Sequence, residues 1–310
     1  MTGASGHVGG TIADSLACDG HDVLAVSRRL LHPESVGDAV AADISNRDAV
    51  EDIAARPPCD AIVHAAAAID ADPQSVRVSQ VNCVGTQNIH WLAERWAVRG
   101  FVFISSLPVV GAPRVLPVDE EHPLDPPTAY HASKLFGERL TGLSRRRGVA
   151  ASSLRLTSPV GPGMPAERIC SVFVSRAVTG EPLEVAGRGT RAQDYVDVRD
   201  VAAAVAGCLR AGAVGTFNVA SGRAITNDEL ARACVELLGS DSEVRLKGED
   251  DPEEGIRWEV SIERARQAFG YAPRFSLADS VLAVAEGEPT GVASTTSKSP
   301  RREELRKKSG

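Results

Sequence analysis

Two side chains of the sequence, Tyr130 and Lys134, have the types and the spacing for proton-transfer chemistry. At positions i and i+4 of a helical pattern they lie on the same helix face. An ammonium group beside a phenol favours the phenolate, so we expect Lys134 to lower the pKa of Tyr130 from its ordinary value of about 10. Tyr130 would then act as a general acid and base near neutral pH. A tyrosine and a lysine at this spacing usually form only a surface pair, so this interpretation depends on the neighbouring motifs.

The start of the chain carries a glycine-rich stretch that could bind phosphate. Residues 2–9 read TGASGHVG and lead into a helical pattern over residues 11–17. Glycine allows the backbone to turn tightly and to approach a pyrophosphate, and the N-terminus of the following helix offers unpaired N–H groups to the anion. A surface turn is the alternative for such a motif when it stands alone. The residues that we expect to contact a dinucleotide here are Gly3, Ser5, Gly6, His7, Val8 and Gly9.

The elements that must position these residues alternate between strand and helix, which indicates βαβ units and a mostly parallel sheet. Apolar runs predict strands over residues 22–27, 61–65 and 101–105, and helical spacing predicts helices over 81–98 and 130–147. The expected fold class is therefore α/β, with a doubly wound, mostly parallel Rossmann sheet and a smaller C-terminal α/β substrate domain. We expect the Rossmann domain to span residues 1–156, with 190–222 returning to it, and the substrate domain to span 157–189 and 223–286.

One strand of this sheet is missing from the sequence. The glycine loop should follow a buried strand, yet only Met1 precedes Thr2. In a doubly wound sheet that strand is central, so its loss would leave two neighbouring strands with unpaired edges. We therefore predict that the native protein begins several residues upstream and that Met1 lies inside or at the end of the first strand.

Composition points to a small-molecule enzyme. The net charge of -7 and the pI of about 5.6 argue against a surface that binds nucleic acid or anionic lipid. No apolar run approaches the roughly 18 residues that span a bilayer, and the N-terminus does not resemble a signal peptide, so we expect a cytoplasmic protein. The six cysteines and seven histidines are scattered, so we predict neither a metal site nor a disulfide framework.

Two segments lack the patterns of core elements. Residues 158–165 read SPVGPGMP, and a loop this rich in proline and glycine is typical of functional sites, so we expect it to border the substrate. Residues 287–310 turn to Thr, Ser, Lys and Arg and are too polar to pack a core. We expect this segment to be a disordered tail.

Taken in order, these motifs resemble the extended short-chain dehydrogenase/reductase superfamily, and within it the NAD-dependent epimerase/dehydratase family. The resemblance covers roughly residues 2–285 and includes the glycine loop, the Tyr-x-x-x-Lys pair, and the stretches 193–201 and 217–220. It implies that Asp43 and Ile44 contact the adenine, that residues 64–67 line the cofactor, and that Asn82 is a structural asparagine. The further cofactor contacts that it implies are Asp43, Ile44, Ala65, Ala66, Asn82, Ser105, Tyr130 and Lys134.

The resemblance also implies roles for the catalytic residues. Tyr130 acts as the acid and base, Lys134 also holds the nicotinamide ribose, and Ser106 hydrogen-bonds the substrate carbonyl or hydroxyl. Ser105 is the alternative to Ser106. We expect NADP rather than NAD, because Arg28 and Arg29 follow the second strand where NAD enzymes place a carboxylate, and arginines there can bind a 2′-phosphate. NAD remains the alternative.

The expected reaction is alcohol–ketone hydride chemistry on a sugar or nucleotide sugar, like that of a 4-epimerase. Related nucleotide-sugar enzymes commonly carry Asn and Arg where this chain has Ser158 and Gln193, and Arg191 could replace the missing arginine at the substrate diphosphate. An NADPH-dependent ketoreductase acting on a non-nucleotide ketone is therefore the first alternative. A non-catalytic dinucleotide-binding regulator is the second. The expected partner is a small-molecule substrate, with a homodimer as a possible assembly.

Elimination is not expected. Sugar dehydratases of this superfamily usually carry an Asp-Glu pair directly after the active-site Ser or Thr, where this chain has Leu107 and Pro108. Neither side chain can donate or accept a proton. The nearest carboxylates, Asp119, Glu120 and Glu121, are expected to form a solvated loop.

Overall fold

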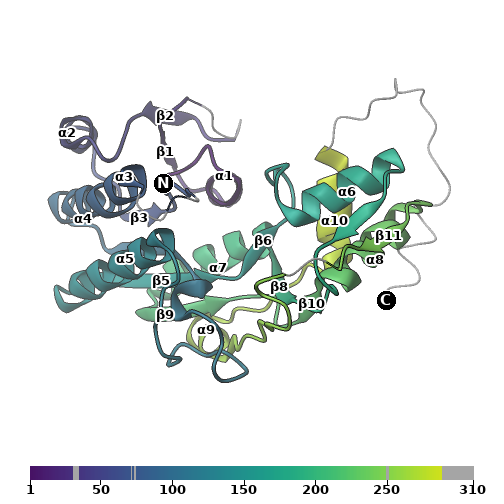
Figure 1. Cartoon of the computed structure of the whole chain (residues 1–310). Helices are drawn as coiled ribbons and strands as arrows, with labels where there is room; N and C mark the ends of the chain where they lie inside the picture. The colour runs from purple at the N-terminus through teal and green to yellow at the C-terminus, as the bar shows by residue number, and fades with distance from the viewer. Residues whose placement is uncertain (31–34, 71, 73–74, 249–250, 288–310) are drawn as a thin grey trace.

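A mostly parallel sheet forms the larger half of the molecule (Figure 1). The computed structural model describes residues 1–30, 35–70, 72, 75–248 and 251–287. Every neighbouring pair of strands in this sheet is parallel, as expected for an α/β fold. In spatial order the strands are β2 (Asp38–Ala41), β1 (Leu24–Ser27), β3 (Ala61–His64), β4 (Gly100–Ser106), β5 (Ala150–Leu156) and β9 (Gly215–Val219).

A single residue, Thr2, lies between β1 and β3 at the centre of the sheet. Thr2 forms isolated parallel bridges with Val26 on one side and His64 on the other. The Met1 carbonyl accepts a hydrogen bond from the Val26 N–H at 2.8 Å, and the Gly3 N–H donates to the Val26 carbonyl at 2.8 Å. This is the position at which the sequence predicts the missing strand. The predicted upstream residues stay a prediction.

Helices cover both faces of the large sheet. Alternate residues of β4 enter two separate cores: Phe101 and Phe103 pack among residues of α2 and α4, whereas Val102 and Ile104 pack among residues of α1 and α7. Because both faces are covered, the strands read as nearly continuous apolar runs. The flanking helices are α1 (His7–Cys18), α2 (Arg47–Ala54), α4 (Gly85–Arg95), α5 (Ala129–Arg146) and α7 (Val198–Ala211).

The smaller half holds a second core built on short strands. β8 pairs in parallel with β6 and in antiparallel fashion with β10, and β7 pairs with β11. Phe173, Leu230 and Val281 bring α6, α8 and α10 together over this layer. None of the helices in the described ranges is long and apolar enough to cross a membrane. The elements are β6 (Ser158–Val160), α6 (Ile169–Thr179), β7 (Leu183–Val185), β8 (Ala192–Asp197), β10 (Ala224–Thr226), α8 (Asn227–Leu238), β11 (Val244–Leu246) and α10 (Leu277–Gly287). The remaining helix, α9 (Glu263–Phe269), packs instead on α7 and β9 of the larger half.

Several element boundaries differ from the expected ones. The helix expected over residues 81–98 starts instead with the short α3 (Val76–Val78) and a π-helical turn (Ser79–Val84), and it ends with α4 at Arg95. The segment 190–222 divides, because β8 lies in the smaller sheet whereas α7 and β9 join the larger one. β6 occupies the start of the loop expected over 158–165, and a short 3-10 helix (Leu107–Val110) follows β4. Gly287 ends α10, and the rest of the expected tail lies outside the described residues.

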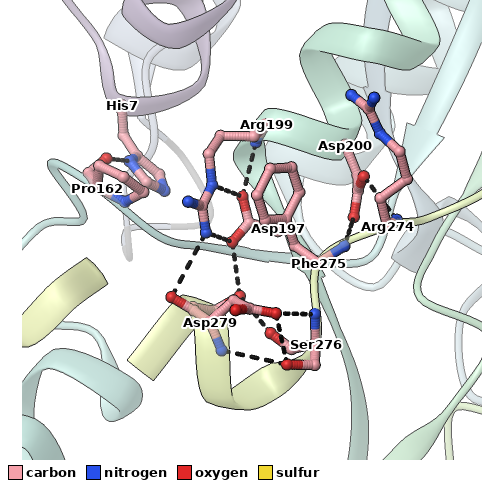
Figure 2. Close-up of polar contacts among 10 residues, drawn as sticks. His7, Pro162, Asp197, Arg199, Asp200, Arg274, Phe275, Ser276 and Asp279 are labelled. Carbon is pink, nitrogen blue, oxygen red and sulfur yellow. Dashed lines mark hydrogen bonds and ion pairs between the residues drawn. The ribbon is translucent and has the colours of Figure 1, made fainter. Parts of the chain in front are cut away.

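The two halves are joined at the N-terminus of α7 (Figure 2). The buried Asp197 carboxylate accepts hydrogen bonds from the Arg199 guanidinium at 2.8 Å and from the Ser280 hydroxyl of α10 at 2.7 Å. Asp200 accepts from the backbone N–H groups of Arg274 and Phe275 at 2.9 and 3.1 Å. The Arg199 guanidinium also lies 3.8 Å from the centroid of the Phe275 ring. These contacts fix the C-terminal segment to a helix of the large sheet.

Two glycines of α5 provide a test of how closely this helix packs on β4. A Cβ atom at Gly137 would overlap the ring of Phe103, whereas a Cβ at Gly142 would meet nothing within 4 Å. We expect Gly137→Ala to lower the free energy of unfolding by about 1–3 kcal/mol through overpacking. Gly142→Ala should raise it by about 0.5–1 kcal/mol, because alanine is the better helix former. Urea denaturation measures both changes, and equal effects of the two variants would contradict the packing described here.

Candidate active site

The glycine loop is packed too closely for side chains at two of its glycines. Gly3 has a φ of 75°, and a Cβ there would lie 2.6 Å from the Ala66 nitrogen. A Cβ at Gly9 would overlap the Gly3 carbonyl. Ser5 and Gly6, by contrast, are exposed at the start of α1, whose first turn contains no acidic residue. The loop therefore presents the N-terminus of a helix without a neutralising carboxylate, which suits an anion.

The loop expected to border the substrate lies beside this glycine loop (Figure 2). The His7 Nδ1 atom is 3.0 Å from the carbonyl oxygen of Pro162. Burial lowers the pKa of His7, so the imidazole is neutral at pH 7 and Nδ1 donates this hydrogen bond. The segment 161–165 is thus connected to the first residue of α1.

His64 joins the loop to the helices, a role that the sequence did not reveal. Its Nδ1 atom is 2.6 Å from the Thr2 hydroxyl, and its Nε2 atom is 2.9 Å from the Thr86 hydroxyl. The ring is completely buried, and burial holds its pKa well below the ordinary value. A neutral imidazole has one donor and one acceptor nitrogen, so each hydroxyl meets a complementary partner. The sequence feature that could have indicated this role is the position of His64 at the end of a buried strand.

Asn82 connects the segment after β3 to the turn that carries Tyr130. Its amide oxygen accepts from the Ala68 N–H at 2.7 Å, and its amide nitrogen donates to the Ala68 carbonyl and to the Ser133 hydroxyl, both at 2.9 Å. The Ser133 hydroxyl in turn donates to the Tyr130 carbonyl at 2.6 Å. Asn82 lies in the π-helical turn, and such turns are frequent at functional sites.

Tyr130, Lys134 and Ser106 all lie on elements that meet at the carboxyl end of β4. Ser106 is the last residue of β4 and is partly exposed. Tyr130 and Lys134 lie in the first turns of α5, which begins after the Thr128 cap. The Lys134 ammonium donates to the Ile104 carbonyl of β4 at 2.8 Å and lies 5.7 Å from the centroid of the Tyr130 ring.

The expected effect of Lys134 on Tyr130 is wrong for this structure. Burial raises the pKa of Tyr130 to about 12, and the opposing influence comes from Arg168 rather than from Lys134. The physical reason is that burial disfavours the charged phenolate, while the Lys134 ammonium is directed at Ile104. Burial also lowers the pKa of Lys134 to about 8, and Glu138 offsets part of this effect. The phenol is therefore protonated at neutral pH.

Ser105, expected at the cofactor and as the alternative to Ser106, has its side chain committed elsewhere. Its hydroxyl donates to the buried Glu138 carboxylate at 2.6 Å. Successive residues of a strand point to opposite faces, so Ser105 and Ser106 cannot both face the same site. Of the two, only Ser106 keeps a free hydroxyl among the described contacts.

The two residues expected at the substrate lie in one polar chain. The Ser158 hydroxyl and the Gln193 amide are 2.7 Å apart. With the amide oriented to satisfy all partners, its oxygen accepts from Arg191 at 2.9 and 3.0 Å and its nitrogen donates to Ser158. Arg191 is also paired with Glu253, and its side chain is 30% exposed. Arg191 is thus already neutralised by a carboxylate from a distant part of the chain.

The residues expected around the adenosine lie after β1 and β2. Arg28 and Arg29 are exposed, and their side chains form no hydrogen bond or ion pair within the described ranges. The Asp43 carboxylate accepts from the Ser45 N–H and hydroxyl at 2.9 and 2.6 Å, which lowers its pKa with a smaller contribution from Arg28. Ile44 is buried, and a Cβ at Gly85 would lie 2.8 Å from its side chain.

Comparison with known proteins identifies similar chains. The model of the NAD dependent epimerase/dehydratase family matches residues 1–220. A dTDP-glucose 4,6-dehydratase of Streptomyces niveus is 28% identical over 86% of this chain and 81% of its own. A UDP-glucose 4-epimerase of Mycolicibacterium smegmatis is 29% identical over 92% and 96%.

Solved structures agree in fold. A UDP-glucose 4-epimerase of Thermotoga maritima, solved with UDP-glucose, superposes with a TM-score of 0.83 at 24% identity and covers 92% of this chain and 96% of its own. A UDP-glucose 4-epimerase of Thermus thermophilus, in complex with NAD, gives 0.80 at 24% identity, with 94% and 98% covered. Both likenesses therefore extend over the large and the small sheet.

The raised pKa of Tyr130 can be measured directly, because the chain has only three tyrosines. Burial also raises the pKa of Tyr195 and Tyr271. We expect phenolate absorbance of the folded protein to stay flat up to about pH 11, whereas the denatured chain ionises near pH 10. A group that ionises below pH 10 in the folded protein and disappears in Tyr130→Phe would contradict this expectation and restore the influence of Lys134.

Proposed function

This chain belongs to the NAD-dependent epimerase/dehydratase family, and we propose that it interconverts an alcohol and a ketone on a nucleotide sugar, with 4-epimerisation as the net reaction. The observation that carries the proposal is that Lys134, near the Tyr130 ring, is hydrogen-bonded to Ile104 at the end of β4, the strand whose last residue is Ser106. The named relatives support a nucleotide sugar as the substrate class. The family and the NAD complexes of solved relatives favour NAD over the NADP expected from Arg28 and Arg29.

The residues around the glycine loop fit a dinucleotide. Gly3 and Gly9 leave no room for side chains, and the start of α1 has exposed backbone and no acidic residue in its first turn. We assign the pyrophosphate to this loop, the adenine to the Asp43–Ile44 segment and the nicotinamide ribose to Lys134. Bound NAD would supply the acceptor and donor of hydride.

Proton transfer falls to Tyr130. Because its phenol is protonated at neutral pH, it can donate a proton to the oxygen of a ketone that is being reduced. The partly exposed Ser106 hydroxyl can donate a second hydrogen bond to the same oxygen. In the opposite direction the phenolate has to accept the proton, and the cation that favours this phenolate in the structure is Arg168. Tyr130 and Ser106 are therefore the catalytic residues of the proposal.

One observation favours the second candidate, a ketoreductase on a non-nucleotide ketone. Gln193 stands where related nucleotide-sugar enzymes place an arginine, and Glu253 already neutralises Arg191. A substrate diphosphate would have to displace Glu253 to reach the Arg191 guanidinium. Membership of an enzyme family argues against the non-catalytic regulator. A homodimer and a cytoplasmic location remain predictions.

Elimination lacks its proton-transfer groups in this arrangement. Leu107 is buried and follows Ser106 directly. Glu120, expected in a solvated loop, is instead almost buried and accepts from the Asn218 N–H at 2.8 Å. Glu121 pairs with Arg264 at 2.7 Å. These carboxylates are therefore engaged in structural contacts.

Tyr130→Phe tests the proposed reaction. We expect the rate of interconversion of UDP-glucose and UDP-galactose in the presence of NAD to fall by roughly 10²–10⁴-fold, because the proton donor is lost. NAD affinity, measured by calorimetry, should stay within about twofold, because the phenol hydroxyl is not part of the phosphate or adenine contacts.

Tyr195→Phe is the matched control, since the Tyr195 hydroxyl is buried without a hydrogen-bond partner among the described residues. Full epimerase activity in Tyr130→Phe would overturn the proposed function. Turnover of simple ketones with no reaction of nucleotide sugars would select the ketoreductase.

The same assay can test the absence of elimination. With dTDP-glucose or UDP-glucose we expect mass spectrometry to detect no 4-keto-6-deoxy sugar, since each missing acid or base costs about 10²–10⁴ in rate. Its formation by the parent protein, and its loss in Tyr130→Phe, would show that Glu120 or Glu121 can reach the substrate after all.

A further inference from the structure

A buried carboxylate lies on the same helix as Tyr130 and Lys134. Glu138 of α5 accepts hydrogen bonds from Arg155 Nε and Nη2, both at 2.9 Å, and from the Ser105 hydroxyl at 2.6 Å. The side chains of Arg155 and Glu138 are only 4% and 6% exposed. Ser105 and Arg155 are opposite each other in the register of β4 and β5, so one carboxylate binds both members of a cross-strand pair.

Glu138 is also one helical turn after Lys134. Residues at i and i+4 lie on the same helix face, so the carboxylate and the ammonium lie on the side of α5 that packs on the sheet. Lys134 is 3% exposed, and within the described residues its ammonium donates a hydrogen bond to the Ile104 carbonyl alone. A buried ammonium without a nearby anion tends to lose its proton, because desolvation disfavours the charged form.

We propose that Glu138 is a positioning residue for the reaction. Its carboxylate, fixed by Arg155 and Ser105, supplies the negative charge that keeps the buried Lys134 protonated and directed at Ile104. Lys134 in turn can hold the cofactor ribose as an ammonium donor only while it is charged. The effect of Glu138 on the charge of Lys134 does not depend on the proposed function, whereas the role of Lys134 at the cofactor rests on it.

The other ionisable groups around Lys134 do not supply this charge. Burial, with a smaller contribution from the charge of Lys134, lowers the pKa of both His64 of β3 and His131 of α5, so they are neutral at pH 7. Tyr130 is a neutral phenol. Arg155 is a cation paired with Glu138. Among the described residues, Glu138 is thus the one acidic group that raises the pKa of Lys134, which burial lowers to about 8.

The charge of Lys134 can be measured without substrate or cofactor. The chain has five lysines, which are Lys134, Lys247, Lys298, Lys307 and Lys308. Carbon-13 labelling of lysine therefore gives a spectrum with five side-chain signals, and Lys134→Met assigns the one of interest. We expect this signal to titrate near pH 8, well below the ordinary value of about 10.4 for lysine.

Glu138→Gln should lower the pKa of Lys134 by at least about one pH unit, because it removes the anion and leaves Arg155 as an unpaired cation. That unpaired charge can prevent folding, so the second variant combines Glu138→Met with Arg155→Leu. Replacement of a whole buried ion pair by apolar residues is often tolerated. The double variant should also titrate below the parent, by about one pH unit.

Ser105→Ala is the matched control, since it removes one hydrogen bond to Glu138 and leaves both charges in place. Its Lys134 signal should titrate with that of the parent. A folded double variant whose Lys134 titrates at the parental pH would overturn the proposal, because Glu138 would then serve stability alone.

The pH profile of turnover links this measurement to the reaction. The charged form of Lys134 is the active one, so activity is lost as pH rises through its pKa, and in the double variant this loss should move to lower pH. A shifted lysine signal in a protein without hydride activity would support the role of Glu138 and refute the proposed function. An active double variant with an unshifted lysine signal would support the proposed function and refute the role of Glu138.

Discussion

Charged groups that leave water must find their partners inside the protein, and this constraint organises the region between α5 and the end of β4. Lys134, Glu138 and Arg155 are all nearly inaccessible to solvent, and each has a partner supplied by a different element. Lys134 donates to a backbone carbonyl of β4, and Glu138 accepts from Ser105 of the same strand. Arg155 of β5 and Glu138 of α5 are each other's partners. The position of the helix on the sheet is therefore fixed by polar contacts as well as by the apolar core around Phe101 and Phe103.

A second set of hydrogen bonds, made by His64 and Asn82, fixes the glycine loop and the segment after β3 to the neighbouring helices. His64 joins Thr2 to Thr86, and Asn82 joins the segment after β3 to the turn of Tyr130. Both side chains are buried, and both ring nitrogens of His64 and both amide atoms of Asn82 have hydrogen-bond partners. The glycine loop is thus hydrogen-bonded through His64 to α4, and the segment after β3 is hydrogen-bonded through Asn82 to α5.

The features that the sequence predicted are those set by local spacing. The glycine loop, the Tyr130–Lys134 pair and the apolar strands depend on neighbours a few residues away, so composition and periodicity were sufficient. The orientation of Ser105 could not be predicted, because alternation along a strand does not tell which face meets α5. The pKa of Tyr130 depends on desolvation and on the direction of the Lys134 ammonium, and Glu253 neutralises Arg191 from 62 positions away along the chain. Such contacts between distant segments leave no periodic trace.

The absence of a side chain at Gly137 has a consequence for the reach of Lys134. Gly137 faces the Phe103 ring directly, so no atom holds α5 away from β4 at this turn. Lys134 lies on the preceding turn, and its ammonium donates to the Ile104 carbonyl, one residue after Phe103. Gly137 therefore allows α5 to approach β4 more closely than any residue with a side chain would. A larger residue would lift the helix, and a lysine side chain of fixed length could no longer touch the strand and face the active site at the same time.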